Sequence, residues 1–484
     1  MNHEPADITN SDNAMNNDDV QAGTFSVVDA QEVTNAIGKL SKKKASKLDG
    51  VCIESISNAH PVLLHIMSKL YTSMLTHGFI PESLMKTVIT PIVKSQNKSK
   101  SDVNNYRPIA VASTFLKILE SIIKDRLVNQ LQVSDHQFGY KKQLSTESCA
   151  FTLKSVLHKY VNRNSKMYVC FLDASKAFDL VNHNSLFRIL ESRGVSANIL
   201  RIVKYLYKFQ KCQVSWDGET SDDFVSTRGV KQGGILSPSF FNVYMHELSE
   251  RLDSIRTGCI VGSKLVNHLL YADDLVIFSP TAEGLRKLLR VCDSFAENFN
   301  LVFNSAKSVC MALTKNKFLA NIPVPNMYLQ GNVLSTVNRV KYLGYIITSD
   351  LSDDADIEER VRWIYSVANI LKRKFSNCKT VVKSKLFSSY FNQFYGLTLW
   401  AQASTRTLQS IKVAYNDAFR IFFDVKRGES VSLNMVRHNV RTLQEMRRIC
   451  IYRSLERFKR SPNVLVQTCM GEEYSSLLSR ILYR

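Results

Sequence analysis

Two adjacent carboxylates, Asp273 and Asp274, interrupt the otherwise apolar stretch NHLLYADDLVIFSP between Asn267 and Pro280. The runs on either side, HLLYA and LVIF, have the length and composition of short buried strands. Because neighbouring side chains of a strand point to opposite faces, two adjacent Asp side chains converge only at a turn. The stretch therefore predicts a tight β-hairpin with both carboxylates at its tip. Two unpaired carboxylates are costly to bury together, so the tip needs a partner of positive charge.

A third carboxylate has the same setting. Asp173 directly follows the apolar run YVCFL and stands 100 residues before Asp273. Three carboxylates at one sheet edge repel one another, and ligands that are all oxygen favour Mg²⁺ or Mn²⁺. Two such ions about 4 Å apart form a phosphoryl-transfer site. Taken alone, the Asp273–Asp274 pair is more typical of an exposed acidic turn, but Asp173 and the basic chain around it favour the metal site.

The chain is strongly basic. Its 484 residues include 63 Lys and Arg against 43 Asp and Glu, which gives a formal net charge of +20. The first 38 residues carry seven acidic side chains and no Lys or Arg, whereas residues 351–484 hold 23 basic and 12 acidic side chains. A basic body of this kind favours a polyanionic partner such as a nucleic acid.

The ten cysteines are scattered, with neither zinc-site spacing nor a disulfide framework. Reduced thiols of a nuclear or cytoplasmic protein are therefore expected. The N-terminus lacks the basic and apolar regions of a secretion signal. The uncharged stretch Leu386–Thr405 is too polar for a membrane-spanning helix, and we expect a buried helical hairpin there. We thus expect neither secretion nor a membrane partner.

The pattern of apolar residues predicts an α+β chain whose last quarter is helical. Strands are expected at Thr87–Val93, Tyr168–Leu172 and Val340–Ile347, and helices at Phe115–Leu131, Leu236–Leu252 and Ala282–Phe299. The segment RGVKQGGILSP (residues 228–238) places two glycines before a helix. Glycines allow a ligand to approach the backbone, and a helix N-terminus favours phosphate, although most such pairs are ordinary loops.

Three motifs in this order, FLDASKAFD, GVKQGGILSPSFFN and YADD, resemble the A, B and C motifs of reverse transcriptases. More narrowly, they resemble those of non-LTR (LINE-like) retrotransposons. Further blocks also match in order: KKKASKLDG, NNYRPIAVASTFLKILESII, SDHQFGYKKQLSTESCA, LVFNSAKSVCM and VKYLGYIIT. The resemblance covers residues 32–440. It implies an RNA-directed DNA polymerase of a mobile element, with a right-hand fold of fingers, palm and thumb.

The resemblance also implies a division into domains. The N-terminal extension and fingers would occupy residues 27–160, the palm 161–348 with fingers elements around 225–240, and a helical thumb 349–440. Composition adds a disordered acidic tail at residues 1–26 and a basic helical C-terminal segment at 441–484. The palm is expected to be an antiparallel sheet with helices. The thumb is expected to follow the phosphates of an RNA–DNA duplex through Lys372, Arg373, Lys374, Lys383 and Lys385.

Roles for single residues follow from the same resemblance. The expected catalytic residues are Asp173, Asp273, Asp274 and Lys307, of which Lys307 would protonate pyrophosphate. Two Mg²⁺ ions, or Mn²⁺ in their place, would be held by Asp173, the main-chain carbonyl of Ala174, Asp273 and Asp274, with Asp274 the less direct ligand. The nucleotide would be bound by Lys94, Arg107, Phe178, Gln232 and Gly233. Tyr342, Leu343 and Gly344 would form the primer grip.

Phe178 is expected to exclude the ribose 2′-OH as a steric gate, because a bulky ring beneath C2′ accepts only deoxyribose. An ordinary core Phe178 and a solvated loop Lys94 remain alternatives. The expected partners are an RNA template, a DNA primer and dNTPs, with no small organic cofactor. The chain has no endonuclease motif, so we expect a polymerase-only piece of a mobile element, and a separate endonuclease is a further candidate partner.

Two positions depart from the family pattern. Lys47-Leu48 stands where Gly-Pro is usual, and Gln143 replaces a glycine before Ser145-Thr146. These departures leave open a catalytically degenerate relic that only binds nucleic acid, against which the three intact aspartates count. An RNA-binding protein like the group II intron maturases is the other alternative, and the basic tail from Arg441 is short for that role.

Overall fold

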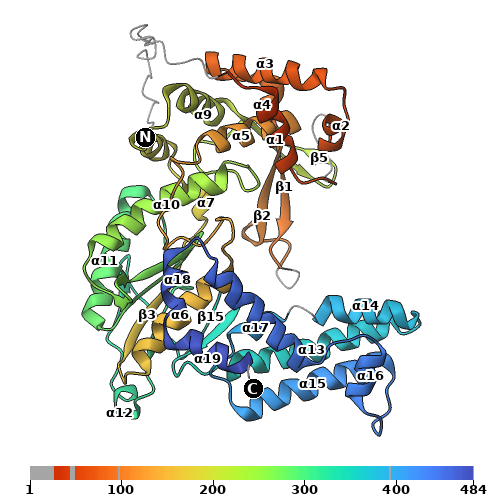
Figure 1. The fold of residues 1–484 in the computed structure, drawn as a ribbon. Helices are drawn as coiled ribbons and strands as arrows, with labels where there is room; N and C mark the ends of the chain where they lie inside the picture. Colours follow the sequence, from red (N-terminus) through yellow and green to blue (C-terminus); the bar gives the residue numbers. More distant parts are fainter. Residues whose placement is uncertain (1–26, 44–49, 96–98, 392–393, 483–484) are drawn as a thin grey trace, which may run out of the picture. The chain divides into compact units, whose positions relative to one another are not determined.

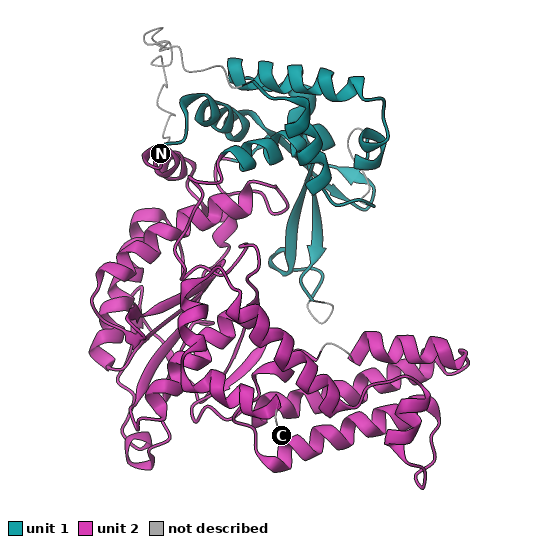
Figure 2. Cartoon of the chain, in the orientation of Figure 1, with its two compact units in different colours: residues 1–126, 194–226 teal, residues 127–193, 227–484 magenta. Residues whose placement is uncertain are grey.

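The computed structural model describes residues 27–43, 50–95, 99–391 and 394–482. The chain forms two compact units, which Figure 2 colours separately: unit 1 comprises residues 1–126 and 194–226, and unit 2 the rest. Residues 127–160, which we expected to belong to the fingers, thus group with unit 2. Residues 194–226, which we expected to belong to the palm, group with unit 1. The predicted tail, 1–26, and Lys47-Leu48 lie outside the described residues.

Unit 1 is built around a β-hairpin (Figure 1). Strand β1 (Thr87–Val93), with the bounds predicted, pairs antiparallel with β2 (Tyr106–Ala112) and parallel with β4 (Lys211–Trp216). The short strands β5 (Glu219–Thr220) and β6 (Phe224–Val225) complete this sheet on β4. Its helices are α1 (Ala30–Lys39), α2 (Ile53–Ser57), α3 (Val62–His77), α4 (Glu82–Met85), η1 (Val103–Asn105), α5 (Thr114–Arg126) and α9 (Ala197–Phe209).

Unit 2 contains a five-stranded sheet in the order β14-β11-β3-β10-β9. The strands are β3 (Met167–Asp173), β9 (His268–Tyr271), β10 (Asp274–Ser279), β11 (Val309–Leu313) and β14 (Ser335–Thr336). All pairings are antiparallel except that of β11 with β14. The prediction of an α+β protein whose central part is an antiparallel sheet with helices is therefore confirmed.

Helices cover this sheet. Helix α11 (Ala282–Phe299), with the bounds predicted, packs against β10 and β3, and α6 (Thr146–Val161) packs against β9 and β3. Because side chains alternate along a strand, one set, which includes Phe171 and Val276, forms a core with α6. This unit also contains the long helix α10 (Ser237–Ser254). Its shorter elements are α7 (Ala177–Leu180), α8 (His183–Ser192), β7 (Cys259–Val261), β8 (Lys264–Val266), α12 (Lys317–Ala320), β12 (Tyr328–Leu329) and β13 (Asn332–Val333).

One pair of cysteines differs from the expectation of reduced thiols. Cys170 on β3 and Cys310 on β11 face each other in the register of the two strands and are joined as a disulfide. The scattered positions of these residues in the sequence hide the pairing, because 140 residues separate them. The other eight cysteines are free.

Two further expectations need correction. Val340–Ile347 is not one strand but a hairpin of β15 (Arg339–Tyr342) and β16 (Tyr345–Thr348), in which Leu343 and Gly344 turn with φ of 46° and 82°. Leu386–Thr405 is not a helical hairpin: within its described residues α14 (Thr380–Phe391) ends, a 3₁₀ turn η2 (Leu397–Leu399) follows, and α15 starts at Thr405. Trp400 is nevertheless buried there, as expected of a core segment.

The last quarter of the chain is helical, as predicted. It consists of α13 (Asp354–Phe375), α14, α15 (Thr405–Phe423), α16 (Val431–Arg437), α17 (Leu443–Lys459), α18 (Val464–Met470) and α19 (Glu473–Leu482). Helices α13 and α15 pack together, while α18 and α19 pack against α6. A buried ion pair, Lys154 Nζ to Asp353 Oδ1 at 2.5 Å, also joins α6 to this region. None of the described helices combines the length and the apolar character needed to cross a membrane.

Candidate active site

The two adjacent carboxylates lie at a hairpin tip, as the sequence predicts. Strands β9 and β10 pair so that Tyr271 faces Asp274, which leaves Ala272 and Asp273 as a two-residue turn. Ala272 is buried and adopts φ of 59°, a left-handed conformation that costs a residue with a side chain roughly 1–2 kcal/mol. Strain of this kind persists only where the surrounding structure enforces it, and it is concentrated at functional sites.

The third carboxylate joins the other two. Asp173, the last residue of β3, faces Asp274 directly in the antiparallel pairing of β3 with β10. The alternation of side chains places both on the face of the sheet that carries Phe171 and Val276. Asp173 and Asp274, 101 positions apart in the sequence, are thus brought to one sheet edge.

The carboxylates influence one another electrostatically. Desolvation, followed by the negative charges of Asp273 and Asp173, raises the pKa of Asp274 to about 6. The Asp274 side chain nevertheless reaches solvent. A cluster that is crowded with negative charge, yet accessible, fits hard divalent cations bound through oxygen.

A lysine lies beside the cluster. The Nζ atom of Lys307 is 3.6 Å from Oδ2 of Asp173, and its side chain is 67% exposed. The loop that carries Lys307 is fixed to the end of β3, because Asn304 N–H donates to the Asp173 carbonyl at 2.8 Å and Ser308 Oγ accepts from Asp173 N–H at 3.1 Å. Ala174, the expected main-chain ligand, forms a bridge with Phe303 in the same loop.

The predicted nucleotide-binding residues of unit 2 also lie together. Phe178 on α7 stacks on Phe241 at 4.2 Å between ring centroids, and its edge meets the exposed ring of Tyr140 at 6.0 Å. The glycine-containing loop (residues 228–238) lies against α7. Val230 N–H donates to the Phe178 carbonyl, and Gln232 Nε2 donates to Asp179 Oδ1 at 3.1 Å. Phe178 is only half-buried, unlike a residue that serves the core alone.

The glycine-containing loop needs its first glycine for a close approach. Gly229 adopts φ of 86°, and a Cβ there would lie 2.9 Å from Cα of Asp179. The N–H of Gly229 donates to the Val181 carbonyl, and the carbonyl oxygen of Gly229 lies 2.8 Å from Nε2 of His183. Gly233 is exposed, with φ of 114°. The loop is thus held by main-chain contacts beside Phe178.

The residues of the predicted primer grip divide into two groups. Tyr342 is buried, with its ring 5.2 Å from that of Phe171 and its hydroxyl 3.4 Å from Sγ of Cys149. Leu343 and Gly344 form the turn, whose carbonyls accept hydrogen bonds from the Tyr395 hydroxyl and from Arg360. Within the grip, therefore, only the turn presents itself toward solvent.

Lys94 and Arg107 lie in unit 1 at the loop end of the β1–β2 hairpin, where the chain leaves β1 and enters β2. Both are exposed; Lys94 Nζ donates to the Asn104 carbonyl at 2.9 Å, and Arg107 faces Ile92 across the two strands. The hairpin therefore brings these two cations near each other, and their relation to the three carboxylates stays a prediction.

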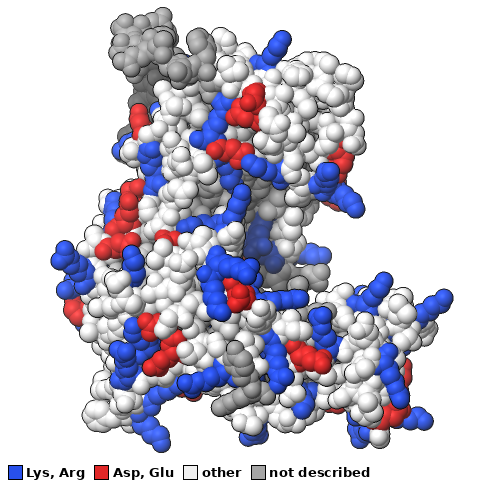
Figure 3. Space-filling model, viewed as in Figure 1, with Lys and Arg blue, Asp and Glu red and all other residues white. Residues whose placement is uncertain are grey.

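Basic side chains are spread over the surface, and Figure 3 shows them outnumbering acidic ones on the visible face. Two of the five lysines and arginines expected to follow a duplex already have acidic partners. Lys372 pairs with Asp424, and Lys383 Nζ lies 3.8 Å from the same carboxylate, over the ring of Phe422. Their positive charge is thus partly neutralised within the chain.

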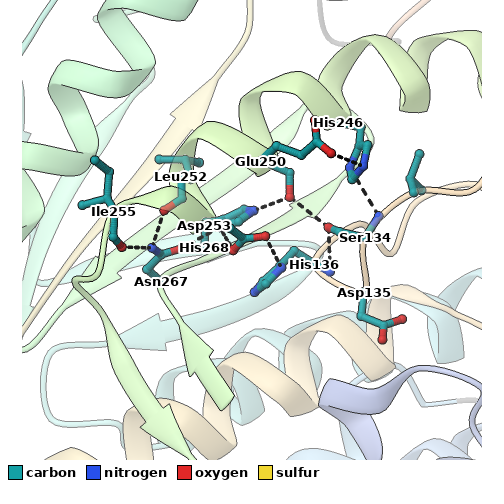
Figure 4. A network of polar contacts seen from close by, with 12 residues as sticks. Ser134, Asp135, His136, His246, Glu250, Leu252, Asp253, Ile255, Asn267 and His268 are labelled. Carbon is teal, nitrogen blue, oxygen red and sulfur yellow. Dashed lines mark hydrogen bonds and ion pairs between the residues drawn. The ribbon is translucent and has the colours of Figure 1, made fainter. Parts of the chain in front are cut away.

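A second polar cluster, which the sequence analysis missed, lies at the other end of β9 (Figure 4). Asp253 on α10 lies 3.5 Å from Nδ1 of His136 and 3.9 Å from Nδ1 of His268. Ser249 Oγ lies 2.7 Å from Nε2 of His268 and 2.9 Å from Oγ of Ser134. These residues come from three separate segments of the sequence, residues 134–136, α10 and the start of β9, so no spacing indicates the cluster.

Two histidines and a carboxylate could in principle bind a metal ion. Their rings, however, are stacked at 4.2 Å with only 20° between the planes. A metal ion bonds to imidazole in the plane of the ring. An ion in the plane of one of these rings would lie out of the plane of the other, because the two rings are stacked face to face. His268 also has hydrogen-bonding partners at both nitrogens, Ser249 and Asn267. The cluster is therefore a hydrogen-bonded brace between α10, β9 and the loop before α6.

Comparison with known proteins identifies the family. The family model "Reverse transcriptase (RNA-dependent DNA polymerase)" matches residues 96–347, more than half of the chain and the whole carboxylate cluster. The chain is 30% identical over 312 residues to a Retrovirus-related Pol polyprotein from the type-2 retrotransposable element R2DM of Drosophila melanogaster, covering 62% of this chain and 28% of that protein. It is 26% identical over 416 residues to the RNA-directed DNA polymerase from mobile element jockey of the same species. This match covers 80% of this chain and 43% of that protein.

Among solved structures, a telomerase from Candida tropicalis in complex with a fragment of telomeric RNA matches at 13% identity and a TM-score of 0.43, covering 87% of this chain and 68% of that one. The assignment does not depend on this distant likeness. The chain spans less than half the length of the two retrotransposon relatives. The chain belongs to the reverse transcriptase family, and within it resembles the polymerases of non-LTR retrotransposable elements, as its motifs predict.

Proposed function

We propose that this chain is the polymerase of a mobile element, an RNA-directed DNA polymerase that extends a primer 3′-OH with dNTPs on an RNA template. The observation that carries the proposal is the meeting of Asp173, Asp273 and Asp274 at one sheet edge beside Lys307. A family model that covers the same residues supports it. The proposed partners are the RNA template, the DNA primer and the dNTPs.

Reverse transcriptases use divalent metal ions, and the donor set fits them. Three carboxylates that repel one another, with Asp274 open to solvent, form a site that a cation stabilises. We propose Mg²⁺, with Mn²⁺ as a substitute, held by Asp173 and Asp273, with Asp274 and the Ala174 carbonyl nearby. When bound there, the ions supply Lewis-acid stabilisation of the phosphate that is transferred.

The chain's own residues position and protonate the reactants. Lys307, exposed and 3.6 Å from Asp173, would donate its proton to the departing pyrophosphate. Phe178, held between Phe241 and Tyr140, would lie under the sugar and exclude a 2′-OH. Gln232 and Gly233 would line the nucleotide pocket, with Gln232 anchored on Asp179.

We assign the palm, thumb and fingers to parts of the two units. The sheet of unit 2 would be the palm, helices α13 to α16 the thumb, and the β1–β2 hairpin of unit 1 part of the fingers, contributing Lys94 and Arg107 to the triphosphate. The primer would meet the main chain of Leu343–Gly344, because the Tyr342 ring is buried. This arrangement leaves catalysis to positioning and to charge stabilisation.

The test is primer extension by the purified chain. It is given poly(rA) primed with oligo(dT), labelled dTTP and Mg²⁺, and compared with Asp273→Asn and with Asp253→Asn, a matched substitution in the second polar cluster. We expect extension that Asp273→Asn abolishes and Asp253→Asn retains. If the parent chain fails to extend in Mg²⁺ or Mn²⁺ while still binding RNA, the proposal is wrong and the chain is a nucleic-acid-binding relic.

A further inference from the structure

The turn that carries Asp273 is held by a segment from far away in the sequence. Residues 136–139, HQFG, run alongside β9: Leu270 N–H donates to the His136 carbonyl and Phe138 N–H donates to the Leu270 carbonyl, each at 2.8 Å. Gln137 forms a parallel bridge with Leu270. The segment thus extends the sheet edge beside the strand that leads into the carboxylate turn.

Gln137 itself bonds to the turn. Its Oε1 atom accepts a hydrogen bond from Ala272 N–H at 3.0 Å and another from Gly139 N–H at 2.8 Å. The side chain is 2% exposed, so both bonds are shielded from water. Ala272 is the left-handed residue directly before Asp273. Gln137 therefore holds the strained backbone position directly before Asp273, which helps to set the direction of that carboxylate.

Gly139 supplies an independent observation. A Cβ at this position would lie 2.4 Å from the main-chain nitrogen of Ala272, a contact with backbone that cannot yield. Its carbonyl accepts a hydrogen bond from Asn242 Nδ2 on α10 at 2.8 Å, and Asn242 is buried. The segment is consequently pressed against the turn from the side of α10.

The segment is also anchored at its start. The main-chain N–H of Ser134 lies 3.3 Å from Nδ1 of His246, and the His136 ring stacks on that of His268 (Figure 4). His246 lies on α10 and His268 on β9, the two elements that flank the segment. Gln137 therefore projects from a rigid base, which a positioning residue requires.

We infer that Gln137 is a positioning residue for the polymerase reaction: it holds the left-handed turn at Ala272 and so aims the carboxylate of Asp273. The inference rests on the proposed function for its catalytic consequence, but the brace itself is a property of the chain. Without the acceptor, the buried N–H groups of Ala272 and Gly139 lose their partner, and the turn relaxes toward a less strained conformation. Asp273 then departs from its place beside Asp173 and Asp274.

The experiment compares Gln137→Met, which keeps the shape but removes the acceptor, with Gln137→Glu, which keeps an acceptor oxygen. Hydrogen exchange of peptides that contain Ala272 reports on the turn, and electron paramagnetic resonance of Mn²⁺ reports on the carboxylates without substrate. For Gln137→Met we expect faster exchange at the turn and about 10–100-fold weaker Mn²⁺ binding. We further expect kcat to fall by about 10²-fold, with little change in the KM for dTTP. Gln137→Glu should protect the turn better than Gln137→Met does.

Gln210→Met is the matched control, since it makes the same substitution at a buried glutamine of unit 1, whose Nε2 atom donates to Thr87 Oγ1 at 2.6 Å. It should weaken the fold while leaving exchange at the turn and Mn²⁺ affinity close to those of the parent. The inference is overturned if Gln137→Met has the exchange and Mn²⁺ binding of the parent, if Gln210→Met disturbs both equally, or if the Glu variant exchanges as fast as the Met variant. If the parent lacks polymerase activity, the proposed function fails, and hydrogen exchange still decides on the brace.

Discussion

Asp274 lies directly opposite Asp173 in the antiparallel pairing of β10 with β3. Residues that face each other in this way have Cβ atoms about 5 Å apart, so two negative charges are held close together by the sheet itself. Asp273, in the turn, adds a third charge that raises the pKa of Asp274 further. The fold thus maintains a repulsive cluster that a bound cation would relieve.

Asp274→Asn should therefore stabilise the metal-free protein. Removing one of two facing like charges is expected to raise the free energy of unfolding at mildly alkaline pH by about 0.5–1 kcal/mol. Urea denaturation in the presence of a chelator measures this gain, which should shrink when Mg²⁺ is added. Asp125→Asn is the control, because Asp125 pairs with Lys39 at 2.6 Å. Loss of this attractive pair should lower the free energy of unfolding or leave it unchanged. A destabilised Asp274→Asn variant would contradict the repulsion.

Replacing Lys307 should slow chemistry without weakening the fold. Lys307→Met removes the proton donor beside Asp173, and we expect the rate of single-nucleotide addition in rapid-quench experiments to fall by about 10²-fold. Stability should change by less than about 0.5 kcal/mol, because the Lys307–Asp173 pair is exposed. Lys307→Arg keeps the charge but holds its proton too tightly, so it should remain slow. The control is Lys287→Met, which replaces an exposed lysine on α11. If Lys307→Arg retained full activity, Lys307 would not be the proton donor.

Phe178→Val should admit ribonucleotides. The shorter side chain opens space where the ring stacks on Phe241, and the preference for dTTP over UTP, measured as the ratio of kcat/KM values, should fall by roughly 10–10²-fold. Tyr140→Phe, which keeps the ring that meets the edge of Phe178, should retain the preference of the parent. If Phe178→Val only destabilises the protein and the ratio stays unchanged, Phe178 is a core residue.

The elements that the sequence predicts well are those with local causes. Helix α11 has the bounds expected, because Thr281 caps its first turn by accepting from Gly284 N–H and Asn300 ends it with φ of 53°. The carboxylate hairpin was predictable because apolar runs flank it on both sides. Val340–Ile347 was mistaken for one strand because Leu343 is an unusual residue for a left-handed turn, and only Gly344 hints at one.

The supports of the site could not be predicted. Gln137 bonds to Ala272 across 135 residues through a main-chain N–H, an interaction that leaves no periodic pattern. The stacking of His136 on His268 likewise depends on the sheet edge, not on spacing. Motifs therefore locate the residues that carry charge, whereas the residues that fix their geometry emerge only from the folded chain.

The second polar cluster predicts a pH dependence of stability. Burial, followed by the charge of Glu250, raises the pKa of Asp253 to about 6. The groups that face Asp253 are His136, His268 and Glu250. Burial lowers the pKa of His136 to about 4 and lowers the pKa of His268 well below its usual range, so both rings are neutral at neutral pH. The folded protein thus holds the Asp253 proton more tightly than the unfolded chain does. This contribution to stability is complete at low pH and is lost as the pH rises through about 6.

Asp253→Asn removes that titration. The free energy of unfolding of the variant minus that of the parent should therefore increase between about pH 4 and pH 7, by about 1 kcal/mol after allowance for solvent screening, since the Asp253 side chain is 40% exposed. Urea denaturation curves of both proteins across this range measure the difference. His438→Gln, a histidine outside the cluster, should give no such rise over the same range. A constant or falling difference for Asp253→Asn would show that Asp253 is not protonated as its surroundings require.

Gln143 shows why the family pattern has a glycine at this position. The residue is exposed and adopts φ of 64°, in the left-handed region that a side chain disfavours. Gln143→Gly should therefore stabilise the protein by up to about 1 kcal/mol, since the strain removed exceeds the entropy gained by the unfolded chain. Thermal and urea unfolding measure the effect. Lys142→Gly, at the neighbouring exposed position with an ordinary φ, should instead destabilise by about 0.5–1 kcal/mol. Equal effects of the two substitutions would mean that the turn imposes no left-handed strain on Gln143.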